Sequence, residues 1–359
     1  LKLSKITIGS SNFLTSSNLV YDNGAFKWCT DIPDDAIISD EGVRSLEEIA
    51  AVFGKNVEPL VPSNYLNSAN KLSVNPPWSL YIGNQKFKMM IQDYVNQYDE
   101  LIKTKDQAML NAHAKISCFI DSLQPAEYCL SLVKEEHKHI TSHIEPYLTS
   151  GILDKPVYAR NKTKTGRLSV IKGPNVLTMH SSLRSGIKNG YCCDFVSIEP
   201  NVLLVSQGRE PRIDIYEHMR KELFTKETSR AKVKIATMAA LYGTGRKDKF
   251  ATKVSDFFDL DNVIKKLEAE VHDDKVENIY GRVINLDGAK DNHLLALWLQ
   301  SSAADAALLG FYNFSKLVSI VPHWIIHDGL IFIYKQNAKK INTLDVGLQY
   351  ELPIKVEKL

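Results

Sequence analysis

The sequence predicts an α+β protein whose helices and antiparallel strands occupy different stretches of the chain. Between about residues 84 and 148, apolar side chains recur at three- and four-residue steps, which is the period of a helix. A second helix is indicated by the apolar run from Leu294 to Phe314. After Pro156 the pattern changes to short strands and turns. Two β-branched runs flank His327-Asp328-Gly329, which is typical of a tight β-hairpin and therefore of antiparallel pairing.

The composition is that of an ordinary globular protein. The chain has 359 residues, of which 44% are hydrophobic and 24% are charged. This length predicts two or three domains, and the composition excludes a collagen-like, coiled-coil or wholly disordered chain. The five cysteines form no C-x-x-C pair, so free thiols in a reducing compartment are expected. Because the net charge is only +2, a nucleic-acid partner would have to be met by a local basic patch.

The first part of the chain mixes short β-like runs with Asn, Ser and Asp turns. Strands are expected at Leu3–Ile8 and Ala36–Ile38, and a helix at Ser45–Phe53. Asn75-Pro76-Pro77-Trp78 predicts a boundary, because two prolines break regular structure on both sides. Residues 1–17 have no long apolar core, so a secretory signal is not expected.

The apolar run from Leu294 to Phe314 is long enough to raise the question of a membrane span. Polar residues interrupt it, and among them Asp305 would cost about 3 kcal/mol to bury in a bilayer. We therefore expect a buried helix of a soluble protein and no membrane partner.

Positive charge is concentrated between Lys155 and Cys193. This stretch has no Asp or Glu and carries eight cationic residues, namely Lys155, Arg160, Lys162, Lys164, Arg167, Lys172, Arg184 and Lys188. Any one of these lysines is explained by exposure to solvent on the protein surface. Eight cations without an anion instead favour a polyanionic partner, and a phosphate backbone is the usual one.

An apolar strand runs from Tyr191 into Asp194, and Glu199-Pro200 then fits the first turn of a helix. An Asp at the end of a core strand is placed to bind a metal ion, since Mg²⁺ prefers carboxylate oxygens. The ordinary alternative is a helix-capping or turn residue.

The segment from Ser229 to Gly243 is strongly helical and is stopped by its glycine. Arg230, Lys234, Met238 and Tyr242 are four residues apart and therefore share one helix face. A triphosphate would meet the two cations while its base and sugar lay against Met238 and Tyr242. The alternative is an amphipathic helix with a solvated basic end.

The hairpin around His327-Asp328-Gly329 requires no chemistry by itself, because Asp-Gly is a standard turn. A carboxylate at a hairpin tip is nevertheless where a second metal ligand, Asp328, could face Asp194.

Five segments resemble, in order and rough spacing over residues 155 to 359, the family A DNA polymerases, the bacterial DNA polymerase I-like group. Thr165-Gly166-Arg167-Leu168-Ser169 matches the family's T-G-R-L-S and is followed by Pro174-Asn175. Asp194–Glu199 resembles motif A, D-Y-S-Q-I-E, and Arg230–Gly243 resembles motif B. Gln300–Asp305 resembles the Q-G-T-A-A-D helix, and His327-Asp328-Gly329 resembles motif C, H-D-E. Each match alone is weak; five in the family's order are specific.

The chain also departs from the family pattern. Gly329 replaces the motif C Glu, and Met238-Ala239 replaces Phe-Gly in motif B. Tyr216 stands where the family's D-I-H segment has a phosphate-contacting His. The segment between motif B and Gln300 is short, which predicts reduced fingers.

The resemblance implies a right-hand polymerase fold, with an antiparallel palm sheet and helical fingers and thumb. Its expected division places an N-terminal region of unknown role at 1–75 and a helical, thumb-like region at 76–155. The first part of the palm, with motif A, is expected at 156–200. Reduced fingers with motif B follow at 201–295, and the second part of the palm with motif C at 296–359.

The implied activity is template-directed DNA synthesis, in which dNTPs are added to a primer 3′-hydroxyl by two-metal phosphoryl transfer. Asp194 and Asp328 would hold two Mg²⁺ ions, for which Mn²⁺ can substitute. Lys234 would also be catalytic, as the proton donor to pyrophosphate. The nucleotide-binding residues implied are Arg230, Lys234, Met238, Tyr242, Glu199 and Tyr216.

Primer-template DNA is the implied macromolecular partner, together with a replication or processivity factor of unknown identity. The implied DNA contacts are Arg167, Thr165, Asn175, Arg184, Gln300 and His327. No D-x-E occurs in the chain, and residues 1–75 are too few for the family's proofreading domain, so no 3′→5′ exonuclease is expected. The small size suggests a phage- or plasmid-encoded enzyme in a host cytoplasm, or one of an organellar matrix.

Two other functions fit the same fold. Met238 and Gly329 resemble the single-subunit, phage-type RNA polymerases, so an RNA polymerase or primer-synthesising enzyme is one alternative, discriminated by the sugar choice at Glu199 and Phe195. A catalytically weak accessory that binds primer-template is the other, favoured by Gly329 and Tyr216. Separately, His139 and His143, with Glu135 one turn earlier, would suit a structural zinc site if this segment is an α-helix.

Overall fold

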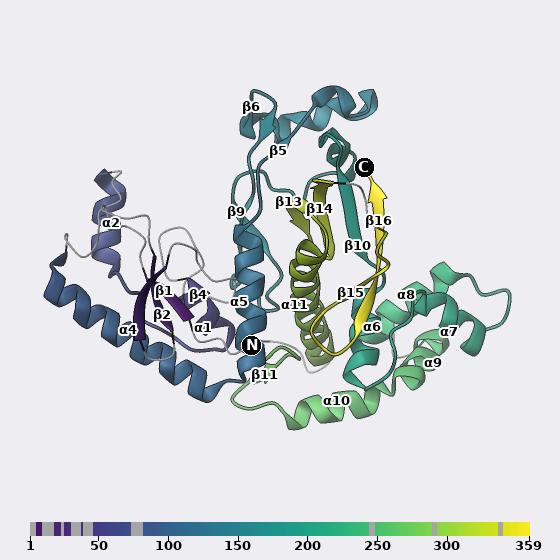
Figure 1. Ribbon diagram of the computed structural model, residues 1–359. Coiled ribbons are helices and arrows are strands. Elements are labelled where there is room, and N and C mark those ends of the chain that lie inside the picture. Colours follow the sequence, from purple (N-terminus) through teal and green to yellow (C-terminus); the bar gives the residue numbers. More distant parts are fainter. Residues whose placement is uncertain are drawn as a thin grey trace. The chain divides into compact units, whose positions relative to one another are not determined.

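The computed structural model describes residues 5–8, 18–22, 25–29, 37–38, 46–72, 82–243, 248–288, 293–336 and 340–359. The chain divides into two compact units, Leu1–Asp121 and Ser122–Leu359 (Figure 1). The boundary expected at Asn75–Trp78 lies outside the described residues. The predicted five-part division assigns expected roles to segments, whereas the two units are defined by compactness. The five-part division therefore stays a prediction.

The first unit combines a small sheet with helices. Its strands are in the order β3-β2-β1-β4, antiparallel except for the β1–β4 pair: β1 (Lys5–Ile8), β2 (Asn18–Asp22), β3 (Ala25–Cys29) and β4 (Ile37–Ile38). The strands and the helix expected in this part of the chain are therefore present. The helices are α1 (Leu46–Val52), α2 (Ser63–Leu72), α4 (Asn84–Thr104) and α5 (Gln107–Asp121).

The helical period of α4 buries one stripe of side chains in the core of this unit. Tyr94, Tyr98 and Leu101 from α4 pack with Phe53 and Ile49. The Tyr94 hydroxyl accepts a hydrogen bond from the Leu46 amide at 3.1 Å, which satisfies a donor at the start of α1. The helical prediction is thus confirmed for α4 and α5.

The helical pattern predicted up to residue 148 is wrong beyond Asp121. Helix α5 ends before Pro125, and after this proline the chain changes to short strands and tight 3₁₀ turns. The strands β5 (Ala126–Glu127), β6 (Leu148–Thr149) and β7 (Ile152–Leu153) form a three-stranded sheet. The 3₁₀ segments between and after them are Leu130–Leu132, Glu135–His143, Glu145–Tyr147 and Ser181–Gly186.

The zinc site considered at His139 and His143 is not supported. Because Glu135–His143 is a 3₁₀ helix with three residues per turn, side chains four positions apart point about 120° away from each other. Within the described residues, no group of three or more His, Cys, Asp or Glu side chains could hold a metal ion.

The second unit is built on an antiparallel five-stranded sheet in the order β13-β14-β10-β16-β15. Its strands are β10 (Tyr191–Phe195), β13 (Ile320–Ile326), β14 (Gly329–Tyr334), β15 (Thr343–Asp345) and β16 (Glu351–Lys358). The predicted α+β class and its antiparallel hairpin are confirmed. A separate ribbon pairs β8 (Val157–Ala159) with β9 (Ser169–Lys172).

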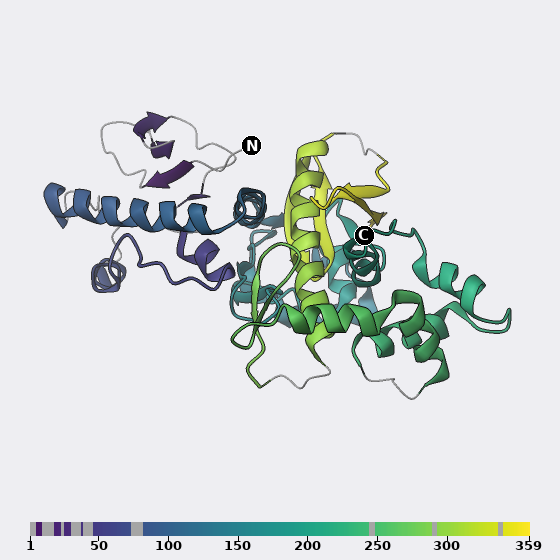
Figure 2. The same cartoon turned by 90° about the horizontal axis from the view of Figure 1, so that it is seen from below.

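Helix α11 (Leu294–Leu317) lies along this sheet and packs on α6, β13 and β15 (Figures 1 and 2). By length and composition it could cross a membrane, but most of its side chains, Asp305 included, are buried within the fold. The buried helix expected for this run is therefore present.

A cluster of helices follows β10: α6 (Ile198–Ser206), α7 (Ile215–Leu223), α8 (Arg230–Leu241), α9 (Lys249–Phe258) and α10 (Leu260–Ala269). The Ser229 hydroxyl caps α8 by accepting from the Lys232 amide. Gly243, at φ 70°, follows its C-terminus, as the sequence predicts. The ribbon of β11 (Lys275–Glu277) and β12 (Val283–Asn285) leads from α10 to α11.

Candidate active site

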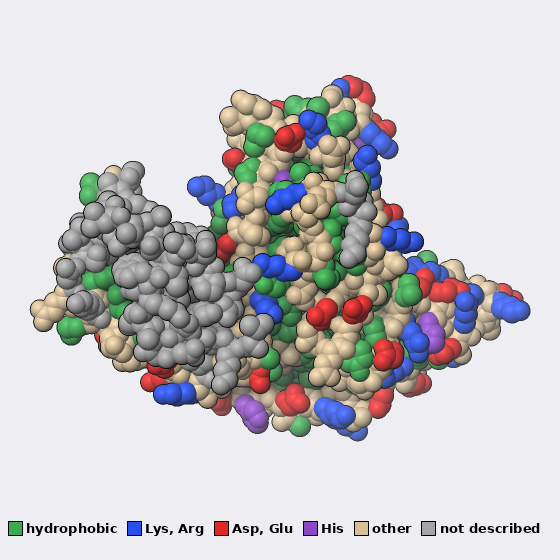
Figure 3. Space-filling model, viewed as in Figure 1, with side chains coloured by type: hydrophobic (Ala, Val, Ile, Leu, Met, Phe, Trp, Pro, Cys, Tyr) green, Lys and Arg blue, Asp and Glu red, His purple; other side chains and the backbone are tan. Residues whose placement is uncertain are grey.

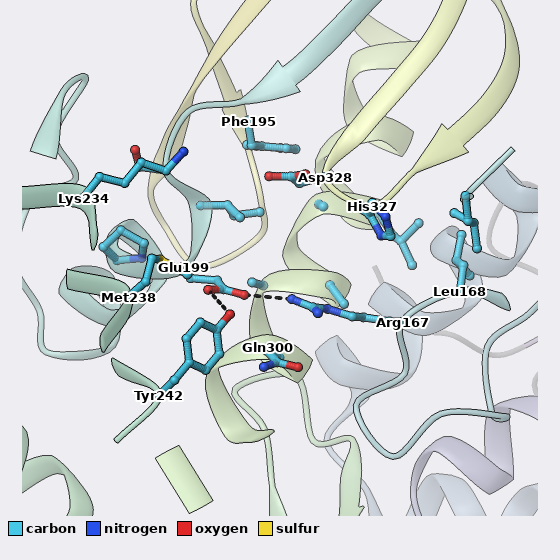
Figure 4. A pocket seen from close by; sticks show the side chains of 18 of the residues that line it. Arg167, Leu168, Phe195, Glu199, Lys234, Met238, Tyr242, Gln300, His327 and Asp328 are labelled. Carbon is cyan, nitrogen blue, oxygen red and sulfur yellow. Dashed lines mark hydrogen bonds and ion pairs between the residues drawn. The ribbon is translucent and has the colours of Figure 1, made fainter. Parts of the chain in front are cut away.

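One cavity of about 380 Å³ lies among α6, α8, α11 and the β13–β14 hairpin (Figure 4). Nine of the residues predicted for the site line it: Arg167, Glu199, Tyr216, Lys234, Met238, Tyr242, Gln300, His327 and Asp328. The predicted residues that do not line it are Asp194, Arg230, Thr165, Asn175 and Arg184.

Strand pairing brings Asp194 and Asp328 together. In β10, Asp194 is directly opposite Gly329 of β14, and Ile326 of β13 also pairs with Gly329. His327 and Asp328 therefore form a two-residue connection, with His327 in the left-handed region at φ 55°. The Phe195 amide donates to the Asp328 carbonyl at 3.1 Å, which joins the end of β10 to the hairpin tip.

Asp194 is harder to ionise in this position than in water. Loss of hydration raises the pKa of Asp194, and the negative charge of Asp328 raises it further. The Cys192 thiol and the Arg184 guanidinium act in the opposite direction, which puts Arg184 within electrostatic reach of Asp194. Burial also raises the pKa of Cys192 to about 12, so this thiol stays protonated. The four cysteines whose side chains are described are all free thiols, as expected.

Gly329 lies where a side chain would meet the Asp194 carboxylate. A Cβ on Gly329 would lie 2.4 Å from Asp194 Oδ1 and 3.3 Å from the Ile326 carbonyl oxygen. Any side chain at this position would therefore displace the Asp194 carboxylate. A glutamate at this position would therefore require the Asp194 carboxylate to move.

Glu199 connects three segments that are far apart in the sequence. It lies in the first turn of α6, is 8% exposed, and accepts hydrogen bonds from the Arg167 guanidinium at 2.9 Å and the Tyr242 hydroxyl at 2.7 Å (Figure 4). Burial, together with the Glu199 carboxylate, raises the pKa of Tyr242 to about 12. Tyr242 therefore remains a neutral hydrogen-bond donor to Glu199 at physiological pH.

Helix α8 presents Lys234, Met238 and Tyr242 to the cavity, so the shared face predicted for these three is confirmed (Figure 4). Arg230, the fourth residue of that predicted face, is instead bound outside the cavity. Its Nε donates to Asp214 Oδ1 at 3.0 Å and Oδ2 at 2.8 Å. The sequence interpretation missed this contact, because nothing in the local pattern couples Asp214 to Arg230.

A buried ionic network supports the loop that carries Arg167. Asp305 of α11 is fully buried and accepts from Arg282 at 2.7 and 2.8 Å, from Arg160 at 3.3 Å and from Asn278 at 2.9 Å. A Cβ on Gly166 would lie 2.4 Å from Arg282 Cζ, so the loop before Arg167 packs directly on this guanidinium. The roles of Arg282 and Asn278 carry no sequence signal of their own.

The predicted basic patch is only partly formed. Arg160 is fully buried in the Asp305 network, Arg167 pairs with Glu199, and Lys188 pairs with Glu127 at 3.2 Å. Lys164 donates to the Asp287 carbonyl. On the face of the second unit shown in Figure 3, Lys and Arg side chains are interspersed with Asp and Glu. Anions distant in the sequence thus pair with three of the eight cations, Arg160, Arg167 and Lys188.

The remaining predicted DNA contacts lie outside the cavity. Thr165 is buried beside the Gly166 turn, Asn175 is exposed, and Arg184 has a buried Nε without a hydrogen-bond partner among the described residues. More of the residues predicted to bind the nucleotide than of those predicted to bind DNA therefore line the cavity.

No protein-family model matches this chain, and no curated protein matches it. Among solved structures, it is similar to the POL domain of Pol1 from M. smegmatis, in a complex with DNA primer-template and dNTP. The identity is 14%, the TM-score is 0.43, and the match covers 87% of this chain and 62% of that chain. This chain thus spans less than two thirds of the mycobacterial one. A likeness of this size assigns neither a family nor an activity, so both rest on the site itself.

Proposed function

We propose that this chain is a template-directed DNA polymerase of the family A type, which adds dNTPs to a primer 3′-hydroxyl. The observation that carries the proposal is the meeting of Asp194 and Asp328 at the ends of adjacent strands, beside a cavity lined by Glu199, Lys234 and Tyr242. In this proposal the five-stranded sheet is the palm, the α7–α10 cluster is a reduced fingers region, and the thumb lies within residues 76–155.

The carboxylate pair suits divalent cations. Asp194 and Asp328 repel each other when ionised, and carboxylate oxygens are the ligands that Mg²⁺ prefers. We propose that these two residues hold Mg²⁺, or Mn²⁺ in its place. When bound, such ions make the primer 3′-hydroxyl a better nucleophile and stabilise charge on the transferred phosphate and on pyrophosphate.

The other residues of the cavity would bind and orient the nucleotide. Lys234 has no ion-pair partner among the described residues, so its ammonium group is free to neutralise a triphosphate and to donate a proton to the departing pyrophosphate. Tyr216 would contact the phosphates, Met238 would lie near the sugar, and Tyr242 would stack at the new base pair. Phosphoryl transfer depends chiefly on such positioning and charge neutralisation.

The DNA would approach from the side of Arg167, Gln300 and His327. Minor-groove acceptors are nearly independent of sequence, so contacts from these three side chains would test pairing geometry without reading bases. Asn175, which is exposed, would contact the strands farther from the reacting end, whereas Arg184 lies within electrostatic reach of Asp194.

The decisive experiment is extension of a labelled DNA primer on a DNA template with Mg²⁺, with dNTPs and rNTPs offered separately. We expect extension with dNTPs only, and no shortening of the primer when nucleotides are omitted. Extension with rNTPs would instead make the chain an RNA polymerase or primer-synthesising enzyme. Tight primer-template binding without extension would make it a replication accessory.

Glu199 is expected to exclude ribonucleotides. Its carboxylate is held by Arg167 and Tyr242 in a buried position, where a 2′-hydroxyl on the incoming sugar would crowd it. Replacing Glu199 with Ala should raise the efficiency of rNTP relative to dNTP incorporation on the order of tenfold or more. Single-nucleotide insertion kinetics measure this ratio. Glu199→Gln keeps the volume and should retain most of the discrimination; equal ratios for the wild type and Glu199→Ala would contradict this role.

A further inference from the structure

The sequence predicts that Arg230 of α8 faces the nucleotide-binding cavity, but the structure places it outside the cavity. It does not line the cavity, yet its guanidinium lies over the ring of Tyr216, 5.2 Å from the centroid, and Tyr216 does line the cavity. Arg230 is thus one side chain away from the space that Lys234 enters from the next turn of the same helix.

Asp214 holds Arg230 in this place. Its two carboxylate oxygens accept from Nε at 3.0 and 2.8 Å, and Oδ1 also accepts from the Glu217 amide at 3.0 Å, which caps α7. Burial opposes ionisation of Asp214, but the hydrogen bonds from Arg230 and from the Glu217 amide outweigh it and lower the pKa of this carboxyl. Asp214 therefore carries its full negative charge at neutral pH.

Another anion can replace Asp214 as the partner of Arg230. The side chains of Arg230 and Asp214 are 45% and 40% exposed, so solvent and ions reach both. An exposed ion pair of this kind is worth little, because water screens it. A triphosphate carries several negative charges and has Lys234 as a second cation to bind, so it can displace a single carboxylate.

We propose that Asp214 is a positioning residue that holds Arg230 beside the cavity and competes with the triphosphate of the incoming nucleotide for this guanidinium. The inference rests on the proposed function, since it assumes that the cavity takes a nucleoside triphosphate. Binding of the nucleotide then includes a local exchange of partners, in which Arg230 leaves Asp214 and joins Lys234 on the phosphates.

The test compares wild type with Asp214→Asn. Asparagine keeps an oxygen that can cap α7 but removes the charge that competes for Arg230. We expect Asp214→Asn to bind dTTP, and inorganic tripolyphosphate used as a minimal probe, about fivefold more tightly, which corresponds to about 1 kcal/mol for an exposed ion pair. The KM for dNTPs should fall by the same factor with kcat nearly unchanged. The difference should shrink at high salt.

Matched variants separate this role from a structural one. Glu222→Gln also removes one carboxylate from α7, where Glu222 pairs with His218 at 3.2 Å, and should leave triphosphate binding unchanged. Asp214→Ala removes the cap as well and should lower the melting temperature more than Asp214→Asn. In the background of Arg230→Gln, the gain from Asp214→Asn should disappear.

The outcomes distinguish this inference from the polymerase proposal. Equal or weaker triphosphate binding by Asp214→Asn, in a protein that extends primers, overturns the role of Asp214 alone. Tighter tripolyphosphate binding by Asp214→Asn without primer extension supports the exchange and contradicts the polymerase activity. No triphosphate binding by either protein overturns both.

Discussion

Replacing Asp194 with Asn is expected to lower the rate of primer extension about a thousandfold or more, because it removes one of the two carboxylates that would hold the metal ions. The same loss is expected for Asp328→Asn. Single-turnover extension with saturating dNTP measures it, and Asp256→Asn, which changes an exposed carboxylate of α9, is the control. Full activity in either site variant would refute the metal assignment.

These two variants should fold at least as well as the wild type. The folded-state pKa of Asp194 is raised, so its contribution to stability is fully present at low pH and is lost as the pH rises through that pKa. At neutral pH the ionised carboxylate therefore opposes folding, and Asn relieves the repulsion with Asp328. Thermal unfolding of the same samples should show no decrease in melting temperature, which separates loss of chemistry from loss of structure.

Replacing Asp305 with Ala is expected to destabilise the second unit by about 3–5 kcal/mol, because it leaves Arg282 and Arg160 buried without their shared counter-ion. Urea unfolding measures the change. Because Gly166 packs on Arg282, the loop carrying Arg167 should loosen as well, and primer-template binding should weaken. A destabilisation below about 1 kcal/mol, the size typical of an exposed pair, would contradict the role of the network.

A paired carboxylate that is only partly buried provides the comparison for Asp305. Glu217 of α7 pairs with Arg220 at 2.7 Å, and these side chains are 31% and 23% exposed, whereas Asp305 is fully buried. Glu217→Gln should change the free energy of unfolding by less than about 1 kcal/mol. The contrast between the two variants isolates the effect of burying the charges.

Local pattern was enough to predict much of the second unit. The i, i+4 spacing from Lys234 to Tyr242 predicts their common face, and the two β-branched runs predict the hairpin that carries Asp328. Both features depend on residues close in sequence, whose geometry follows from helix and strand periods. Pattern failed after Asp121, where apolar spacing continues but prolines and tight turns replace the helix.

Contacts between distant segments could not be predicted in the same way. Arg160 looked like part of a basic surface because its neighbours in sequence are cations, yet its partner Asp305 is 145 positions away. Arg230 was predicted to face the cavity because the i, i+4 rule considers only residues of one helix. The rule does not include the contact of Arg230 with Asp214, which precedes a different helix. The burial of Arg160 and the pairing of Arg230 with Asp214 both depend on which elements pack together.

The sequence by itself determined the elements and the residue types at the site: the helix with its row of Lys234, Met238 and Tyr242, the strand ending in Asp194, and the hairpin with Asp328. Only the tertiary structure decided that a side chain at Gly329 would collide with the Asp194 carboxylate, that Glu199 bridges Arg167 and Tyr242, and that Asp305 lies between Arg160 and Arg282. The physical reason is the separation along the chain over which each kind of interaction acts. Backbone periods act over a few residues, whereas steric exclusion and charge pairing act between whichever side chains the packed fold brings within a few ångströms.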